Sequence, residues 1–164
     1  MTSTHEPPAL FDRYFEEYAV GEQGPPAGTV IAAEDIATFA GLTGDRHPAH
    51  TDADFATPRF GGVIAHGVLT FGVVVGLTVE YNRRAVAYGY DRIRFPHPVV
   101  AGDRVTATSE VVELRDHRNP RIGLVTKRYT GVNQDGATVL VCQHILAVDR
   151  RDVPEDEPSL EPRA

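Results

Sequence analysis

The sequence of residues 61–79 is GGVIAHGVLTFGVVVGLTV, and no other part of the chain constrains the architecture as strongly. This stretch has no formal charge, and apolar residues occupy every side of the helix that it would form. It is short beside the roughly 20 apolar residues that cross a membrane. Because a helix that is apolar all round is stable when a domain encloses it, we predict a long buried helix over residues 65–80.

Strand-like segments follow this helix. Residues 105–114 and 137–148 alternate between apolar and polar side chains, which is the period of a half-buried strand. The four predicted strands are 86–95, 105–114, 122–132 and 137–148, and the Asn-Gln-Asp-Gly sequence at 133–136 has hairpin-turn chemistry. One buried helix followed by four antiparallel strands predicts an α+β fold in which the sheet wraps around the helix.

Shorter elements are predicted ahead of the long helix. Apolar residues at helical spacing indicate a helix over 34–40, and Gly41 is a natural C-terminal stop. Thr51 and Asp54 resemble a capping box, which begins a second short helix. We expect a loop over 58–62.

The length of 164 residues suits one domain with its own core. We assign residues 9–148 to this domain, in which residues 29–32 form a short extended lead-in. Residues 1–8 and the charged, proline-containing tail over 149–164 are predicted to be disordered.

Composition excludes several classes of function. The net charge of −7 leaves no basic surplus for a nucleic-acid backbone. Cys142 is the only cysteine, which rules out an intrachain disulfide and a cysteine-based zinc site. The N-terminus has no signal-peptide pattern, so we expect a cytoplasmic protein with no membrane partner.

The candidate catalytic residues lie in the stretch TGDRHPAH, residues 43–50, and in the His66-Gly67 pair sixteen residues later. Asp45 and His50 place a carboxylate and an imidazole five residues apart across a proline turn. His66-Gly67 opens the long helix, whose first N–H groups carry a positive partial charge. A carboxylate, an imidazole and helix-terminal N–H groups are what proton transfer beside an enolate requires, which points to an acyl thioester substrate.

Residues 39–56, 60–67 and 94–103 together resemble the motifs of MaoC-like dehydratases and R-specific enoyl-CoA hydratases. The resemblance implies a hot-dog fold, a homodimer or a higher homo-oligomer, and an acyl-CoA or acyl-carrier-protein thioester as substrate. It also implies no metal and no cofactor apart from the coenzyme A that belongs to the substrate.

Carried over residue by residue, the resemblance makes Asp45 and His50 the catalytic pair. The N–H of Gly67 would bind the thioester carbonyl, with His66 and His47 as further oxyanion- or substrate-binding candidates. His47 stands where the family usually has asparagine, and Ala49 stands where it usually has a branched aliphatic residue. His50 would act as a general base on water while Asp45 holds that water and protonates C2.

Each assignment has an alternative. Asp45 suits a turn, His50 suits a helix cap, and a buried histidine bonded to backbone is the more ordinary interpretation of His66. The cluster of Asp45, His47, His50 and His66 also offers zinc ligands, although the proline turn does not give the i, i+4 spacing of a helical zinc motif.

Three functions stay open at this point. A hydratase or dehydratase is favoured by the Asp45/His50 loop ahead of the long helix. A hot-dog thioesterase would typically carry its carboxylate on or beside that helix, where residues 65–79 have none. A non-catalytic partner subunit would be expected to lose the Asp45/His50 pair.

Overall fold

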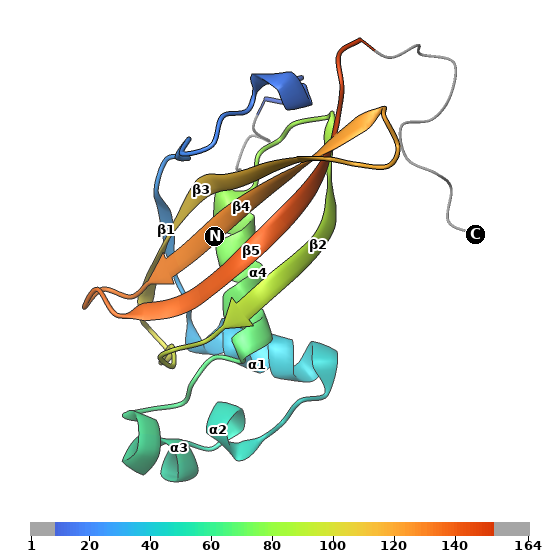
Figure 1. Cartoon of the computed structure of the whole chain (residues 1–164). Helices are drawn as coiled ribbons and strands as arrows, with labels where there is room; N and C mark the ends of the chain where they lie inside the picture. Colours follow the sequence, from blue (N-terminus) through green and yellow to red (C-terminus); the bar gives the residue numbers. More distant parts are fainter. Residues whose placement is uncertain (1–8, 153–164) are drawn as a thin grey trace.

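The computed structural model describes residues 9–152 as a curved antiparallel sheet that wraps around one helix (Figure 1). The strand order is β1-β3-β4-β5-β2, which leaves β1 and β2 at the edges. The strands are β1 (Ala27–Val30), β2 (Ala85–Arg94), β3 (Arg104–Asp116), β4 (Ile122–Val132) and β5 (Thr138–Asp149). The helices are η1 (Phe15–Glu17), α1 (Ala33–Thr43), α2 (Pro48–Thr51), α3 (Ala53–Phe60) and α4 (Gly67–Thr78). The predicted α+β hot-dog arrangement is confirmed.

Helix α4 contacts the sheet through one of its faces. Thr70, Val74 and Thr78 are buried at intervals of four residues, as one side of a helix requires. A Cβ atom at Gly131 of β4 would lie 2.8 Å from Val74, so glycine allows the sheet to approach the helix closely. The Thr78 hydroxyl donates to the Val74 carbonyl at 2.8 Å, which satisfies this buried polar group.

The prediction that α4 is buried on every side is wrong for one stripe. Val68 and Val79 are exposed by 65% and 44%, and Gly72 and Gly76 between them are exposed as well. The helix is also shorter than predicted, spanning 12 residues. No helix within residues 9–152 is long and apolar enough to cross a membrane.

The sheet has one strand more than the sequence predicted. Residues 27–30 pair with residues 104–107 of β3, so the expected lead-in belongs to the sheet as β1. The hairpin between β4 and β5 is confirmed: Gly136 has a φ of +78°, and the Asn133 N–H donates to the Ala137 carbonyl at 2.9 Å. The four later strands lie within about two residues of their predicted bounds.

The helices ahead of α4 end and begin elsewhere than predicted. α1 continues through Gly41 to Thr43, and the C-cap Gly44 has a φ of +78° that lets its N–H reach the Ala40 carbonyl. Asp52, rather than Thr51, caps α3, because its side chain accepts from the backbone N–H groups of Asp54 and Phe55. Pro58 lies inside α3 rather than in a loop, and the helix ends at Phe60, followed by the C-cap Gly61 in the left-handed region.

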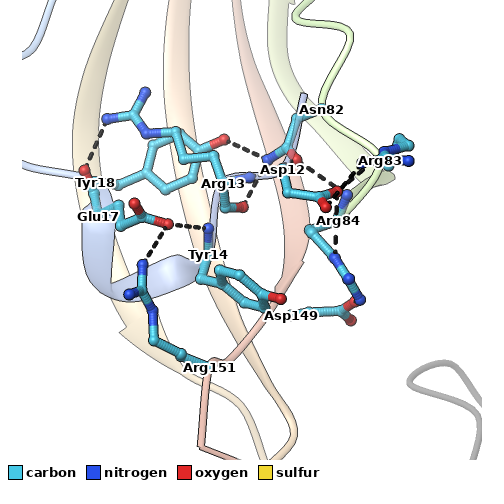
Figure 2. A network of polar contacts seen from close by, with 10 residues as sticks. All are labelled: Asp12, Arg13, Tyr14, Glu17, Tyr18, Asn82, Arg83, Arg84, Asp149 and Arg151. Carbon is cyan, nitrogen blue, oxygen red and sulfur yellow. Dashed lines mark hydrogen bonds and ion pairs between the residues drawn. The ribbon is translucent and has the colours of Figure 1, made fainter. Parts of the chain in front are cut away.

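The far end of the molecule is held by a polar network, which Figure 2 shows. The buried amide of Asn82 accepts from the Arg13 N–H at 3.0 Å and donates to the Arg13 carbonyl at 2.8 Å. Asp12 pairs with Arg83 and Arg84, two residues of the segment that joins α4 to β2. The N-terminal segment is thereby attached to the turn that follows α4.

The residues that the structure describes extend past residue 148. Asp149 is the last residue of β5, Arg150 pairs with Glu16, and Arg151 pairs with Glu17. The remainder of the predicted disordered segments, 1–8 and 153–164, lies outside the described residues.

Candidate active site

The candidate site lies at the N-terminal end of α4. Asp45 follows the Gly44 cap of α1, His50 lies in α2, and His66 is the N-cap of α4. One side-chain atom from each of these residues lies within 4.8 Å of the others. Residues separated by up to 21 positions thus form one cluster, as the sequence motif predicted.

The hydrogen bond of His50 defines its proton arrangement. Its Nδ1 lies 2.8 Å from the backbone carbonyl of Ile64, and a carbonyl oxygen only accepts, so Nδ1 carries a hydrogen. In the neutral ring Nε2 is then the basic nitrogen. The Ile64 N–H donates to the Ala49 carbonyl at 3.0 Å, so a backbone hydrogen bond joins α2 to the segment that precedes α4. The half-buried imidazole of the neutral ring therefore offers Nε2 as a proton acceptor.

His66 supports both members of the predicted catalytic pair. It is 3% exposed, and its Nε2 donates to the backbone carbonyl of Asp45 at 2.9 Å. Its ring stacks on the His50 ring with a centroid distance of 3.8 Å, and Phe39 packs on it at 4.9 Å. This geometry fits the buried, backbone-bonded histidine considered as the alternative, and it makes His66 a support for Asp45 and His50.

Gly67 is the first residue of α4. A Cβ atom there would lie 3.1 Å from the Phe95 ring, so glycine lets the aromatic ring pack against the start of the helix. The His66 side chain makes no capping hydrogen bond to α4. The first-turn N–H groups, which an N-cap side chain would otherwise satisfy, are therefore available to an oxyanion.

His50 and Gly67 line the same cleft, whose volume is about 520 Å³. Its other walls come from α3, from the segment before α4, and from the β2–β3 connection. The lining residues are His50, Arg59, Phe60, Ile64, Ala65, Gly67, Thr70, Phe95, His97, Pro98, Val99 and Val139. The base and the helix terminus thus face one mostly apolar space, as a ligand site requires.

Asp45 and His47 shape the turn beside this cleft. The Asp45 side chain is exposed, and its Oδ1 accepts from the His47 N–H at 3.2 Å. His47 caps α2, because its Nδ1 accepts from the Ala49 N–H at 3.2 Å, and its ring meets Phe55 edge-on. The substrate-binding role predicted for His47 stays a prediction, since its visible contacts are those of a helix cap.

The rival metal site agrees poorly with the ring geometry. The imidazole planes of His50 and His66 are inclined by only 25° with their centroids 3.8 Å apart. A metal ion bonds in the plane of each imidazole at about 2.0–2.1 Å, and two nearly parallel, stacked planes do not meet at that distance. The cluster is better arranged for proton transfer.

Sequence reasoning assigned no role to several cleft residues. Phe95 lies within the motif over 94–103, where the sequence predicts only the end of a strand. Thr70 and Arg59 carried no periodic signal that would place them at the site, because their positions depend on how α3 and α4 dock.

Residues 19–133 match the model of the MaoC like domain, which is most of the chain. The 3-hydroxyacyl-thioester dehydratase Z of Mycobacterium tuberculosis is 34% identical over 131 residues, covering 76% of this chain and 85% of that protein. The (R)-specific enoyl-CoA hydratase of Rhodospirillum rubrum is 39% identical over 107 residues, covering 64% of this chain and 74% of that protein.

The solved structure of a monoamine oxidase regulatory protein from Archaeoglobus fulgidus superposes with a TM-score of 0.79 at 34% identity. The superposition covers 85% of this chain and 96% of that one. The match of sequence, fold and site motif makes the chain a member of the MaoC-like dehydratase family.

Proposed function

We propose that this protein is a hydro-lyase that adds water to a 2-enoyl thioester, or removes it from a 3-hydroxyacyl thioester. The observation that carries the proposal is the His50 tautomer: Nδ1–H is committed to Ile64, which leaves Nε2 as a base in the cleft that Gly67 also lines. The relatives named as a dehydratase and an enoyl-CoA hydratase support the same reaction class.

The reaction follows from these groups. His50 Nε2 takes a proton from water as the water oxygen bonds to C3. The C2=C3 electron pair moves toward the thioester carbonyl, whose developing negative charge meets the Gly67 N–H and the positive end of α4. The acid form of Asp45 protonates C2, and a proton returns from His50 to Asp45. One water has then added across the double bond, on one face if both groups share it.

Hydrolysis of the thioester is the second candidate. It would need a carboxylate that directs water to the carbonyl carbon, and helix α4 carries none. A purely non-catalytic subunit is disfavoured as well, because such a subunit would be expected to lose the Asp45/His50 pair.

Coenzyme A or an acyl carrier protein is the proposed thioester handle, and the cytoplasm is the proposed compartment. We also propose a homodimer. Apolar side chains are exposed on the stripe of α4 and also on β2, an edge strand whose Val86 and Tyr88 are exposed by 42% and 56%. Pairing two β2 edges would continue the sheet and cover the exposed apolar side chains of this strand.

The test is a spectrophotometric assay of the purified protein with crotonyl-CoA, read beside a free-thiol assay. Loss of enoyl absorbance without thiol release is the expected result. Thiol release at the same rate would assign the protein to the thioesterases, and inactivity in both assays with crotonyl-CoA and longer enoyl-CoAs would refute the proposed reaction.

A further inference from the structure

A second cavity, separate from the cleft, lies under the C-terminal half of α4. It has a volume of about 170 Å³ and is largely enclosed between α4 and strands β2, β4 and β5. Its lining residues are Val75, Val79, Glu80, Ala85, Ala87, Tyr90, Lys127, Tyr129, His144 and Leu146. The apolar part of this wall is what an alkyl chain needs, but His144 in the same wall has a buried nitrogen that an alkyl chain would leave without a partner.

The cavity and the cleft lie along the same side of the sheet. Thr70 of α4 and Val139 of β5 line the cleft. Val75 and His144, from the same two elements, line the cavity. From Gly67 to Val75 the helix rises about 12 Å, which is the extent of a medium-length acyl chain. Phe71, one helical turn before Val75 on α4, contacts the Tyr90 ring edge-on at 4.9 Å, and Tyr90 lines the cavity.

His144 lines this cavity and has a hydrogen-bonding atom without a partner. The residue is 6% exposed, its Nδ1 lies 2.8 Å from the Tyr129 hydroxyl, and its ring stacks on Tyr90 at 4.2 Å. Its Nε2 is buried and has no hydrogen-bond partner among residues 9–152. Burial and the nearby Lys127 lower the pKa of His144 to about 4, so the ring is neutral at physiological pH. When the Tyr129 hydroxyl donates to Nδ1, Nε2–H is a donor with no acceptor.

The charges beside His144 are already balanced. Lys127, 3% exposed, forms an ion pair with Glu80, and the other Glu80 oxygen accepts from the Tyr18 hydroxyl at 3.1 Å. A ligand carboxylate would have to displace Glu80 or add an unpaired negative charge in a buried space. A neutral oxygen, such as a ketone or hydroxyl, needs only the one donor that His144 offers.

We infer that this cavity receives the distal part of the acyl chain and that His144 and Tyr129 select chains bearing a neutral oxygen there. The inference rests on the hydration reaction proposed above and adds the substrate class. The thioester carbonyl would lie at Gly67, the chain would pass Phe71, and the distal ketone or hydroxyl would meet Nε2 of His144.

The experiment compares three 2-enoyl-CoA substrates of equal, medium chain length: a plain alkyl chain, one with a ketone near its end, and one ending in a carboxylate. We expect kcat/KM for the keto substrate to exceed the plain one by roughly threefold to tenfold, the value of one buried hydrogen bond. The double variant Tyr129→Phe/His144→Leu, which replaces both polar partners by apolar groups, should remove this preference. His117→Leu, a histidine outside the cavity, is the matched control and should keep it.

The outcomes separate the two proposals. Hydration of crotonyl-CoA without a preference for the keto chain, or a preference that survives in the double variant, would overturn the inference and leave the reaction intact. A preference for the carboxylate chain would overturn the assignment to a neutral oxygen. No hydration of any thioester would overturn both proposals.

Discussion

The two ends of α4 differ in how their polar groups are satisfied. At the N-terminal end, the His66 side chain does not cap the helix, the Asp45 carboxylate is exposed, and His50 lines an open cleft. At the C-terminal end, Lys127 bonds to Glu80, Glu80 to Tyr18, and Tyr18 to Asn82. Figure 2 shows how Asp12 and Arg13 lie beside Tyr18 and Asn82 in this network.

This difference indicates a division of labour along one helix. Groups that must exchange protons with a substrate need hydrogen-bonding atoms that the protein leaves free. Groups that only stabilise the fold have all their hydrogen bonds made within the protein. The experiments below ask whether changes at the first end affect turnover alone and changes at the second end affect stability.

The largest effect is expected at the catalytic pair. His50→Ala removes the base and Asp45→Asn removes the acid, and each should lower kcat for crotonyl-CoA hydration by about 10²- to 10⁴-fold. Both residues lie outside the packed core, so the urea midpoint should change little. Near-normal turnover in either variant would eliminate the mechanism, and a large loss of stability would contradict the proposed division between the two ends.

The next effect concerns acid stability at the opposite end. The pKa of His144 falls from 6.5 to about 4 in the fold, so the unfolded chain binds an extra proton between these values. Stability is therefore complete above pH 6.5 and declines by roughly 3 kcal/mol as the pH falls to 4. The groups facing His144 are Tyr129 and Lys127 from β4 and Tyr90 from β2, with Glu80 bonded to Lys127.

Urea unfolding of wild type and His144→Leu at a series of pH values measures this contribution. The variant should lose the part of the decline between pH 6.5 and 4 that belongs to His144. Parallel profiles for the two proteins would show that the buried imidazole does not govern acid sensitivity.

Breaking the buried ion pair should cost somewhat less. Lys127→Met leaves Glu80 without its cation, and we expect a loss of roughly 2–3 kcal/mol, below the value for fully buried pairs because Glu80 is 25% exposed. Arg128→Met is the matched control on the same strand, since its partner Glu110 and Arg128 itself are both exposed and such pairs contribute about 0–1 kcal/mol. Equal losses in the two variants would argue against a special role for the closed end.

The sequence predicts the features of this contrast that depend on local patterns better than those that depend on contacts between distant segments. Residues whose role depends on chain-local pattern were found: the strands, the hairpin at Gly136, and the convergence of Asp45 with His50. The motif also placed Gly67 at the start of α4.

The failures have physical causes. β1 is a short segment whose identity depends on pairing with β3, about 77 residues away, and a run of four residues has little periodicity of its own. Gly41 resembles a stop, but Gly44 adopts the left-handed conformation because the turn to Asp45 begins there. The exposed stripe of α4 depends on which face the sheet covers, and the Lys127–Glu80 pair joins residues 47 positions apart.

The smallest effect is expected at His47, where this chain departs from the family's asparagine. Its Nδ1 accepts from the Ala49 N–H, which is the bond that an asparagine Oδ1 makes at an N-cap. His47→Asn should therefore change the free energy of unfolding by less than about 0.5 kcal/mol, whereas His47→Ala, which has no acceptor, should lose about 1 kcal/mol. Turnover of crotonyl-CoA by His47→Asn should stay near the wild-type value, because the cap that orients His50 is kept. If kcat instead fell tenfold with stability unchanged, His47 would contact the substrate itself, and the open end of α4 would hold one more functional histidine than the local hydrogen bonds indicate.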